Sequence, residues 1–194
     1  MNRWIHSRFV FVFVAPIILL CAGAQNAVGQ NGATSIFEFD QDIDASRLSI
    51  VNDNVMGGRS SSRASIGGGQ LNFSGNISLQ NNGGFASIRS FPSAMGMDAN
   101  KTIVLRVKGD GRRYKFNLYT PDRRTAFSYQ MEFGTVAGQW IEVRLPVQSF
   151  VAHSFGRQLQ GVPLNASQVQ SVGILLGDKL QGPFQIAVDW IRMQ

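Results

Sequence analysis

Apolar and polar residues alternate along most of the chain after residue 100, and this alternation constrains the fold more than any other feature. Ile103, Leu105 and Val107 fall on one face of an extended chain. The same spacing recurs at 114–118, 127–133, 141–145, 172–176 and 184–190. Because successive side chains of a β-strand point to opposite faces, the pattern predicts half-buried antiparallel strands. It also places Phe127 and Trp190 in the core.

The first half of the chain follows the same scheme with shorter runs. We expect strands at 35–39, 48–51, 60–66, 69–79 and 84–91. A Gly-Asp-Gly sequence at 109–111 predicts a tight hairpin between two strands, since Asp-Gly tolerates positive φ. Helical spacing is limited to short turns at 95–100 and 163–169. Roughly ten to twelve strands without crossover helices predict an all-β, antiparallel β-sandwich or barrel, and disfavour a parallel α/β fold.

The N-terminus has the composition of a secretory signal peptide. Arg3 and Arg8 precede an apolar run that starts at Phe9 and ends in small residues at 22–24. We therefore expect a signal peptide at 1–24, a short flexible segment at 25–34 and one domain at 35–194, exported to the periplasm or the extracellular space. The apolar run is shorter than the roughly 20 residues of a spanning helix, which disfavours a retained membrane anchor. The bulky Leu20 disfavours lipid attachment at Cys21.

The exported domain would contain no cysteine, because Cys21 is the only one in the chain. Such a domain relies on its core, and thiol catalysis, Cys-ligated zinc and iron–sulfur chemistry are excluded. About 165 residues can bury roughly 70% of their unfolded surface, which is enough for a stable core. The net charge of +6 is too mild to indicate a nucleic-acid partner. The arginine pairs at 112–113 and 123–124 are interpreted as solvated charges at opposite ends of one strand.

The segment 51–62, VNDNVMGGRSSS, mixes turn-forming and apolar residues. Its Asn and Asp side chains can form an Asx-type turn, and its paired glycines permit positive φ or a close backbone approach. We expect Val55 and Met56 to tuck under the loop and attach it to the core edge. An ordered, polar-rimmed loop on a rigid scaffold is typical of a recognition site. A β-bulge turn without a ligand is the alternative.

Few residues suit catalysis. The exported domain has one histidine, His153, and the chain contains neither G-x-S-x-G nor H-E-x-x-H. We therefore expect a protein that is not an enzyme and has no cofactor. A hydrolase of unknown substrate stays an alternative, because four carboxylates could meet in space: Asp53, Asp110, Glu132 and Asp178.

Three aspartates, Asp40, Asp42 and Asp44, alternate in a pattern that suits the start of a calcium loop. Ala45 and Val51 stand where an EF-hand needs its glycine and glutamate, so an EF-hand is excluded. Two interpretations remain: a structural calcium in a loop of the sandwich, and a solvated acidic strand end.

Six blocks of sequence resemble the CIA30 family, named for complex I intermediate-associated protein 30. They are VNDNVMGGRSSS at 51–62, GNISLQNNGGFASIRS at 75–90, RVKGDGRRYKFNLYT at 106–120, SYQMEF at 128–133, GQWIEVRLP at 138–146 and GILLGDKLQGPFQIAVDWI at 173–191. The resemblance implies a galactose-binding-domain-like β-sandwich, or jelly roll. It also implies an assembly role without catalysis, as in mitochondrial members. The predicted signal peptide differs from that mitochondrial setting, and the chain therefore resembles a bacterial exported member of the family.

The resemblance and the loop chemistry together indicate a protein partner bound by loop residues. The candidate binding residues are Asn52, Asp53, Gly57, Gly58, Gly83, Gly84, Arg89, Asp110, Trp140 and Asp178. The alternative is a carbohydrate-binding module. In it, Trp140 would stack on a sugar ring while Asp53, Asn82 or Arg89 bonds hydroxyl groups. Trp140 and Tyr119 are predicted on the strand faces opposite the core, and packing of Trp140 under a loop is the competing interpretation.

Overall fold

The computed structural model describes residues 1, 32–40, 46–122 and 124–194. Contacts divide the chain into two units, 1–30 and 31–194, and the fold described below is that of the second. Apart from residue 1, the predicted signal peptide at 1–24 lies outside the described residues, as does most of the predicted flexible segment. Within the described residues, no helix is long and apolar enough to cross a membrane.

The described chain is built of strands joined by turns and short 3₁₀ helices. The strands are β1 (Thr34–Phe37), β2 (Leu48–Asn52), β3 (Ser61–Gly67), β4 (Gln70–Ile77), β5 (Ala86–Ser90), β6 (Thr102–Lys108), β7 (Arg113–Tyr119), β8 (Phe127–Gly134), β9 (Trp140–Pro146), β10 (Val151–Ser154), β11 (Arg157–Gln158), β12 (Ser171–Leu176) and β13 (Gly182–Met193). The 3₁₀ helices are η2 (Asp53–Met56), η3 (Gln80–Asn82), η4 (Val147–Ser149) and η5 (Ala166–Gln168). The turn expected at 163–169 is thus confirmed by η5, whereas 95–100 forms no helix.

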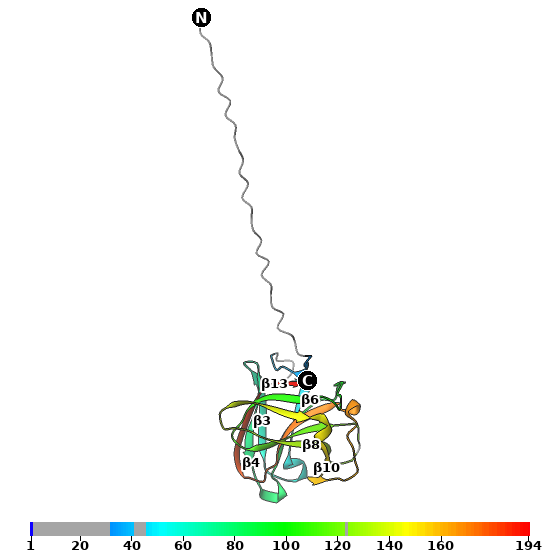
Figure 1. The fold of residues 1–194 in the computed structure, drawn as a ribbon. Coiled ribbons are helices and arrows are strands. Elements are labelled where there is room, and N and C mark those ends of the chain that lie inside the picture. The colour runs from blue at the N-terminus through cyan, green and yellow to red at the C-terminus, as the bar shows by residue number, and fades with distance from the viewer. Residues whose placement is uncertain (2–31, 41–45, 123) are drawn as a thin grey trace. The chain divides into compact units, whose positions relative to one another are not determined.

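The strands form two antiparallel sheets. The six-stranded sheet has the order β3-β4-β13-β6-β9, with β1 paired to β13, and the seven-stranded sheet has the order β11-β10-β8-β7-β12-β5-β2. Figure 1 shows β3 beside β4 and β13 beside β6 in the first sheet, and β8 beside β10 in the second. The two sheets pack as a sandwich, which confirms the predicted all-β antiparallel architecture.

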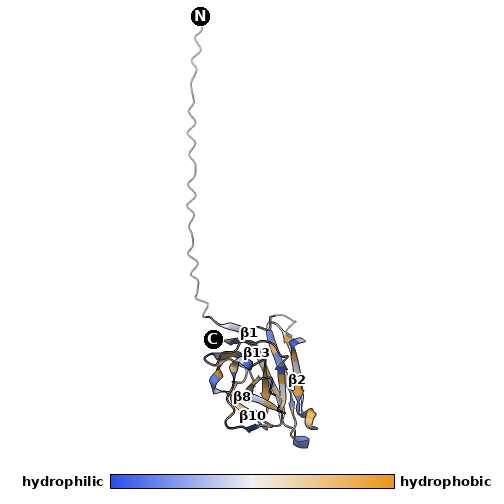
Figure 2. Ribbon diagram, turned by 90° about the vertical axis from the view of Figure 1, so that its right-hand side faces the viewer, coloured by the Kyte–Doolittle hydropathy of each residue, from blue (hydrophilic) through white to orange (hydrophobic). Residues whose placement is uncertain are grey.

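The core lies between the two sheets and is formed by the alternating apolar residues. Ile103, Leu105 and Val107 of β6 are fully buried, as are Tyr114 and Phe116 of β7 in the opposite sheet. Each strand therefore carries hydrophobic and hydrophilic residues in turn, as the mixed colours of the strands show in Figure 2. Burial of these side chains supplies the main driving force for folding, at roughly 25 cal/mol per Å² of apolar surface.

A β-bulge changes the face on which Trp190 lies. The register between β13 and β6 shifts after Val188, so that Trp190 pairs with Arg106 on the outer face of the six-stranded sheet. Trp190 is only partly buried, and the guanidinium of Arg192 lies 4.4 Å from its ring centroid. The prediction of a core Trp190 is therefore wrong, because the bulge adds one residue to the alternation. Phe127 is in the core, as predicted.

The Gly-Asp-Gly sequence does not form the predicted hairpin. β6 pairs with β9 and β13, whereas β7 pairs with β8 and β12 in the other sheet. The segment 109–112 is therefore a crossing between the two sheets. Gly109 forms a parallel bridge with Ala137, and a Cβ on Gly109 would lie 2.4 Å from Oγ1 of Thr135. Glycine is needed there for close packing rather than for a hairpin turn.

Candidate functional site

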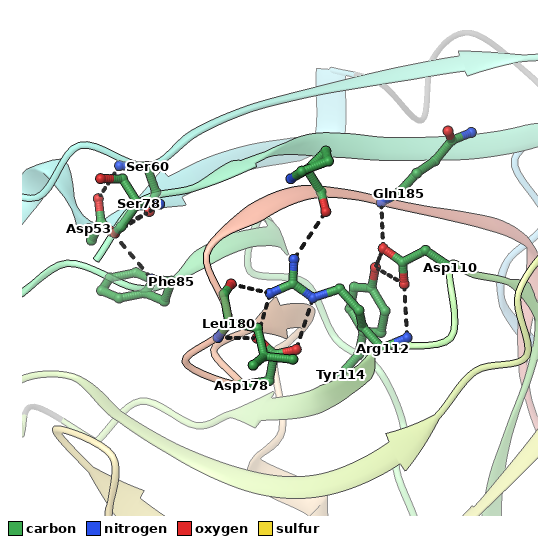
Figure 3. Close-up of polar contacts among 11 residues, drawn as sticks. Asp53, Ser60, Ser78, Phe85, Asp110, Arg112, Tyr114, Asp178, Leu180 and Gln185 are labelled. Atoms are coloured by element: carbon green, nitrogen blue, oxygen red, sulfur yellow. Dashed lines mark hydrogen bonds and ion pairs between the residues drawn. The ribbon is translucent and has the colours of Figure 1, made fainter. Parts of the chain in front are cut away.

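The turn η2 follows β2 directly and is organised by one buried carboxylate. The side chain of Asp53 accepts hydrogen bonds from the backbone N–H and the hydroxyl of Ser60, and from the backbone N–H groups of Gly84 (2.6 Å) and Phe85 (3.3 Å). Figure 3 shows Ser60 and Phe85 approaching Asp53 from two separate loops. We call Asp53, Gly58, Ser60, Gly84 and Phe85 the Asp53 cluster; it joins the loop after β2 to the loop before β5.

Two glycines make room for the Asp53 carboxylate. A Cβ on Gly58 would lie 2.4 Å from Cγ of Asp53, and a Cβ on Gly83 would lie 2.6 Å from its Oδ2. Gly57 has φ of +87°, a left-handed conformation that ends η2. The predicted need for glycine in this loop is therefore explained by the space around Asp53.

Hydrogen bonding keeps Asp53 ionised. Burial alone would raise the pKa of its carboxyl group, but the hydrogen bonds from Ser60, Gly84 and Phe85 outweigh burial and hold the pKa below its usual range. Asp53 is fully buried, so it cannot contact a partner directly. Its role in the structure is to fix the conformation of two loops.

Val55 and Met56 point outward, contrary to the prediction that they tuck under the loop. Val55 is 69% exposed and Met56 is 54% exposed. The physical reason is that Asp53, rather than an apolar side chain, attaches the turn to the sandwich. Asn52 contributes from the end of β2, where its Oδ1 accepts a hydrogen bond from the Ser62 hydroxyl (2.7 Å).

A second cluster surrounds the crossing between β6 and β7. The guanidinium of Arg112 binds Asp178 through two hydrogen bonds, Nε to Oδ2 (2.9 Å) and Nη2 to Oδ1 (2.6 Å). It also donates to the carbonyl oxygens of Leu180 and Pro183. Asp110 accepts hydrogen bonds from the backbone N–H groups of Arg112 (3.0 Å) and Gln185 (2.9 Å) and from the hydroxyl of Tyr114. We call these residues the Arg112 cluster; most of them are drawn in Figure 3.

The ion pair in this cluster is largely shielded from solvent. The Arg112 and Asp178 side chains are 12% and 13% exposed, so the interpretation of Arg112 as a solvated charge is wrong. The hydrogen bond to Asp178 raises the pKa of Arg112. Burial would raise the pKa of Asp178, but the hydrogen bonds from Arg112 and from the Leu180 N–H, together with the charge of Arg112, lower it. Burial and the nearby Asp110 raise the pKa of Tyr114. Arg113 is 64% exposed and pairs with Glu132, and Arg123 lies outside the described residues.

The two clusters lie at the same end of the sandwich. A Cβ on Gly177, next to Asp178, would lie 3.6 Å from Cβ of Phe85 and 3.8 Å from the Gly84 carbonyl oxygen. Figure 3 shows both clusters in one close-up. We call this region, η2 with the Asp53 and Arg112 clusters, the loop end. Besides Val55 and Met56, its loops expose Leu79 and Leu180.

Two predicted site residues lie elsewhere. Arg89 is on β5, and its guanidinium lies 3.5 Å from the ring centroid of Tyr119 on the outer face of the seven-stranded sheet. Trp140 is on β9 in the other sheet, where Arg106 and Lys108 lie 5.3 and 5.1 Å from its ring centroid. The other eight candidates gather at the loop end.

The outer face of the seven-stranded sheet carries polar residues that the sequence interpretation did not single out. Asn117 of β7 and Gln130 of β8 are buried there, although they point away from the core. Asn117 is next to Phe116 in the chain and Gln130 is next to Met131, so the alternation places both polar side chains on the sheet face away from the core. This alternation is the sequence signal that could identify them.

The described residues contain no group of three or more His, Cys, Asp or Glu side chains placed to hold a metal ion. Asp40 is described and exposed, whereas Asp42 and Asp44 of the suggested calcium loop lie outside the described residues. The four carboxylates considered for hydrolysis each accept hydrogen bonds from the chain itself: Asp53, Asp110 and Asp178 as above, and Glu132 from Arg113.

Comparison with solved structures bears out the sandwich fold. The family 11 carbohydrate-binding module from Clostridium thermocellum, solved with a β-1,3-1,4-mixed-linked tetrasaccharide, superposes with a TM-score of 0.61 at 13% identity, covering 83% of this chain and 94% of that one. An exo-β-agarase gives 0.52 at 11% identity, covering 83% of this chain and 25% of the enzyme. Likeness at such low identity concerns the fold alone.

Comparison by sequence identifies the family. The mitochondrial complex I intermediate-associated protein 30 of Mus musculus is 35% identical over an alignment of 97 residues that covers 46% of this chain and 29% of the mouse protein. The probable counterpart of Caenorhabditis elegans is 32% identical over an alignment of 94 residues that covers 46% of this chain and 28% of that protein. The matched part is thus less than a third of the length of these relatives. The family profile described as complex I intermediate-associated protein 30 (CIA30) matches residues 37–188. This chain belongs to the CIA30 family.

Proposed function

We propose that this chain is an exported, non-enzymatic binding protein that recognises a protein partner through the loop end of its sandwich. The observation that carries the proposal is the exposure of Val55 and Met56, 69% and 54%, on a turn fixed by a buried carboxylate. Exposed apolar side chains on a rigid loop suit a protein surface, which can bury them on binding.

The rigidity of the loop end favours binding energetically. Association costs conformational entropy wherever loops or side chains become ordered in the complex. At the loop end, hydrogen bonds to Asp53 and Arg112 already fix the loops before a partner arrives. Leu79 and Leu180 add further exposed apolar side chains at the loop end. The contacts of a partner would therefore contribute to affinity with little loss to loop ordering.

The family supports a protein partner. The names of the curated relatives describe association with an intermediate of complex I. Non-enzymatic action is supported by the way that the candidate carboxylates are engaged, since Asp53, Asp110 and Asp178 all serve as internal hydrogen-bond acceptors. Export is supported by the basic and apolar composition of residues 1–24.

Capture of partners from the native cell envelope tests this proposal. The Val55→Ser/Met56→Ser double variant should recover at least about tenfold less partner than the wild type, since losing one or more interface anchors costs about 1–2 kcal/mol each. Phe155→Ser is the matched control: Phe155 is also exposed, but it follows β10 at the opposite end of the seven-stranded sheet. Equal capture by the wild type and the double variant would refute the loop end as the binding surface.

Carbohydrate binding at Asp53 and Trp140 has less support. Asp53 is buried and fully engaged, and cations already lie near the ring of Trp140. A saccharide would need another surface, and the outer face of the seven-stranded sheet provides one.

A further inference from the structure

Four residues form one cross-strand row on the outer face of the seven-stranded sheet. Arg89 of β5 is paired with Gly173 of β12, Gly173 with Asn117 of β7, and Asn117 with Gln130 of β8. We call Arg89, Gly173, Asn117 and Gln130 the polar row. Since neighbouring strands lie about 4.8 Å apart, the row spans roughly 15 Å across the sheet.

Three atoms of the polar row are buried and have no hydrogen-bond partner in the described part of the chain: Nε of Arg89, Oδ1 of Asn117 and Oε1 of Gln130. Asn117 is 1% exposed and Gln130 is 9% exposed. Each amide makes a single bond through its nitrogen, to Tyr119 and Ser128 respectively. Both partners are hydroxyl groups that can donate or accept, so turning either amide over still leaves one polar atom unpaired. Buried polar atoms are rarely left unpaired, so three in one row are an unusual concentration of unsatisfied polar groups on this face.

Arg89 is held in place and carries an uncompensated charge. Its guanidinium stacks on the ring of Tyr119 at 3.5 Å, and among the described residues no carboxylate pairs with it. Gly173 allows this stack, because a Cβ there would lie 3.3 Å from Cε2 of Tyr119 and 2.6 Å from the Ile88 carbonyl oxygen. Stacking fixes the plane of the guanidinium and leaves its edge free to bind an anion.

A pocket opens at this end of the polar row. Its volume is about 330 Å³, and its lining includes Ser49, Arg89, Phe91, Tyr119, Gln170 and Ser171. Asp122 and Arg124 also reach the pocket, but they form an ion pair with each other (2.6 Å). The charge of Arg89 is therefore the one that remains for a ligand at this pocket, within the residues that the structure describes.

We propose that this face is a second binding site, specific for a saccharide that carries a carboxylate, such as a uronate. The carboxylate would bind the edge of the Arg89 guanidinium, since a planar fork matches a carboxylate with two parallel hydrogen bonds. Sugar hydroxyl groups would bond polar side chains that line the pocket beside Arg89, among them Ser49 and Gln170. The site needs nothing from the loop end and so does not depend on the proposed protein partner.

The composition of the face favours a saccharide over an acidic peptide. A peptide gains much of its affinity from apolar side chains that enter pockets. The pocket beside Arg89 offers the guanidinium of Arg89, the amide of Gln170 and serine hydroxyls. Hydroxyl-rich ligands that also bear a negative charge use all of these groups at once.

Isothermal titration of the purified chain with trigalacturonate tests the proposal. We expect saturable binding that weakens at least about tenfold in two changes: Arg89→Gln, and replacement of the ligand by its neutral methyl ester. Arg89→Lys keeps the charge but lacks the planar fork, so it should recover only part of the affinity. Arg144→Gln, an exposed arginine on the outer face of the other sheet, should bind as the wild type does.

Three results would overturn the site: no saturable binding of trigalacturonate, equal binding of its methyl ester, or unchanged binding in Arg89→Gln. Tighter binding of triglutamate than of trigalacturonate would assign the face to an acidic peptide and overturn the saccharide. The ligand-side comparison remains decisive if Arg89→Gln fails to fold. The Val55→Ser/Met56→Ser variant should bind trigalacturonate normally, which separates failure of this site from failure of the loop end.

Discussion

Replacing Asp53 by asparagine removes the charge at the centre of the loop end while keeping the side-chain size. Oδ1 of Asp53 accepts one hydrogen bond, from the Ser60 N–H, whereas Oδ2 accepts from the Ser60 hydroxyl and from the N–H groups of Gly84 and Phe85. The new amide nitrogen must face at least one of these donors. The least damaging orientation places it against the Ser60 N–H, which then loses its partner.

The magnitude follows from these contacts. A buried N–H without a partner costs about 1–3 kcal/mol, and bonds to a neutral oxygen are weaker than bonds to a carboxylate by roughly 0.5–1 kcal/mol each. We therefore expect Asp53→Asn to lower the free energy of unfolding by about 3 kcal/mol or more. That is a large part of the roughly 5–15 kcal/mol that stabilises an ordinary domain.

Chemical denaturation at pH 7, followed by tryptophan fluorescence, measures this change. The matched control is Asp98→Asn, the same substitution at an exposed aspartate, which should alter the free energy of unfolding by less than about 0.5 kcal/mol. A change below about 1 kcal/mol in Asp53→Asn, or one equal to the control, would contradict the assignment of Asp53 as the residue that fixes both loops.

Three further predictions concern the same end of the molecule. The pKa of Asp53 is lowered in the folded chain, so its carboxylate stabilises the folded state above the ordinary pKa of 3.8. This contribution is lost as the pH falls below that value, and the denaturation curves of the wild type and Asp53→Asn should therefore converge at low pH. Gly58→Ala should destabilise by about 2 kcal/mol or more, since its Cβ would meet Asp53, while Gly67→Ala, with open space around it, should be nearly neutral in the same assay. Arg112→Gln should cost roughly 3 kcal/mol in thermal or chemical unfolding by leaving a largely buried carboxylate unpaired, whereas Arg113→Gln, in an exposed pair, should cost less than about 1 kcal/mol.

The strands and most of the core could be predicted from the sequence because period-two alternation is a local property. Trp190 shows where this fails: a bulge is defined by the pairing between β13 and β6, which lie far apart in the chain. The Gly-Asp-Gly sequence at 109–111 shows the same limit, since local turn chemistry does not tell a hairpin from a crossing between sheets. Both errors concern register and pairing, which depend on residues distant in sequence.

The sequence predicts which loops form the candidate site, but not which of their side chains are buried or which hydrogen bonds they make. Asp53 was singled out from its sequence context, yet its donors come from residues 60, 84 and 85, so its burial could not be foreseen locally. Their apolar character predicts that Val55 and Met56 face inward, a rule that holds on average but fails at this exposed turn. The polar row was missed because its residues come together only through the order of β5, β12, β7 and β8.

The position of Arg112 has a mechanical consequence. The chain passes from one sheet to the other at 109–112 and again between β12 and β13, and Arg112 ties the first passage to the second through Asp178, Leu180 and Pro183. Arg112 thereby links the two sheets at one rim of the sandwich. Because this rim is held by side-chain hydrogen bonds as well as by the chain itself, we expect the loops beside η2 to keep their arrangement when the two sheets shift against each other.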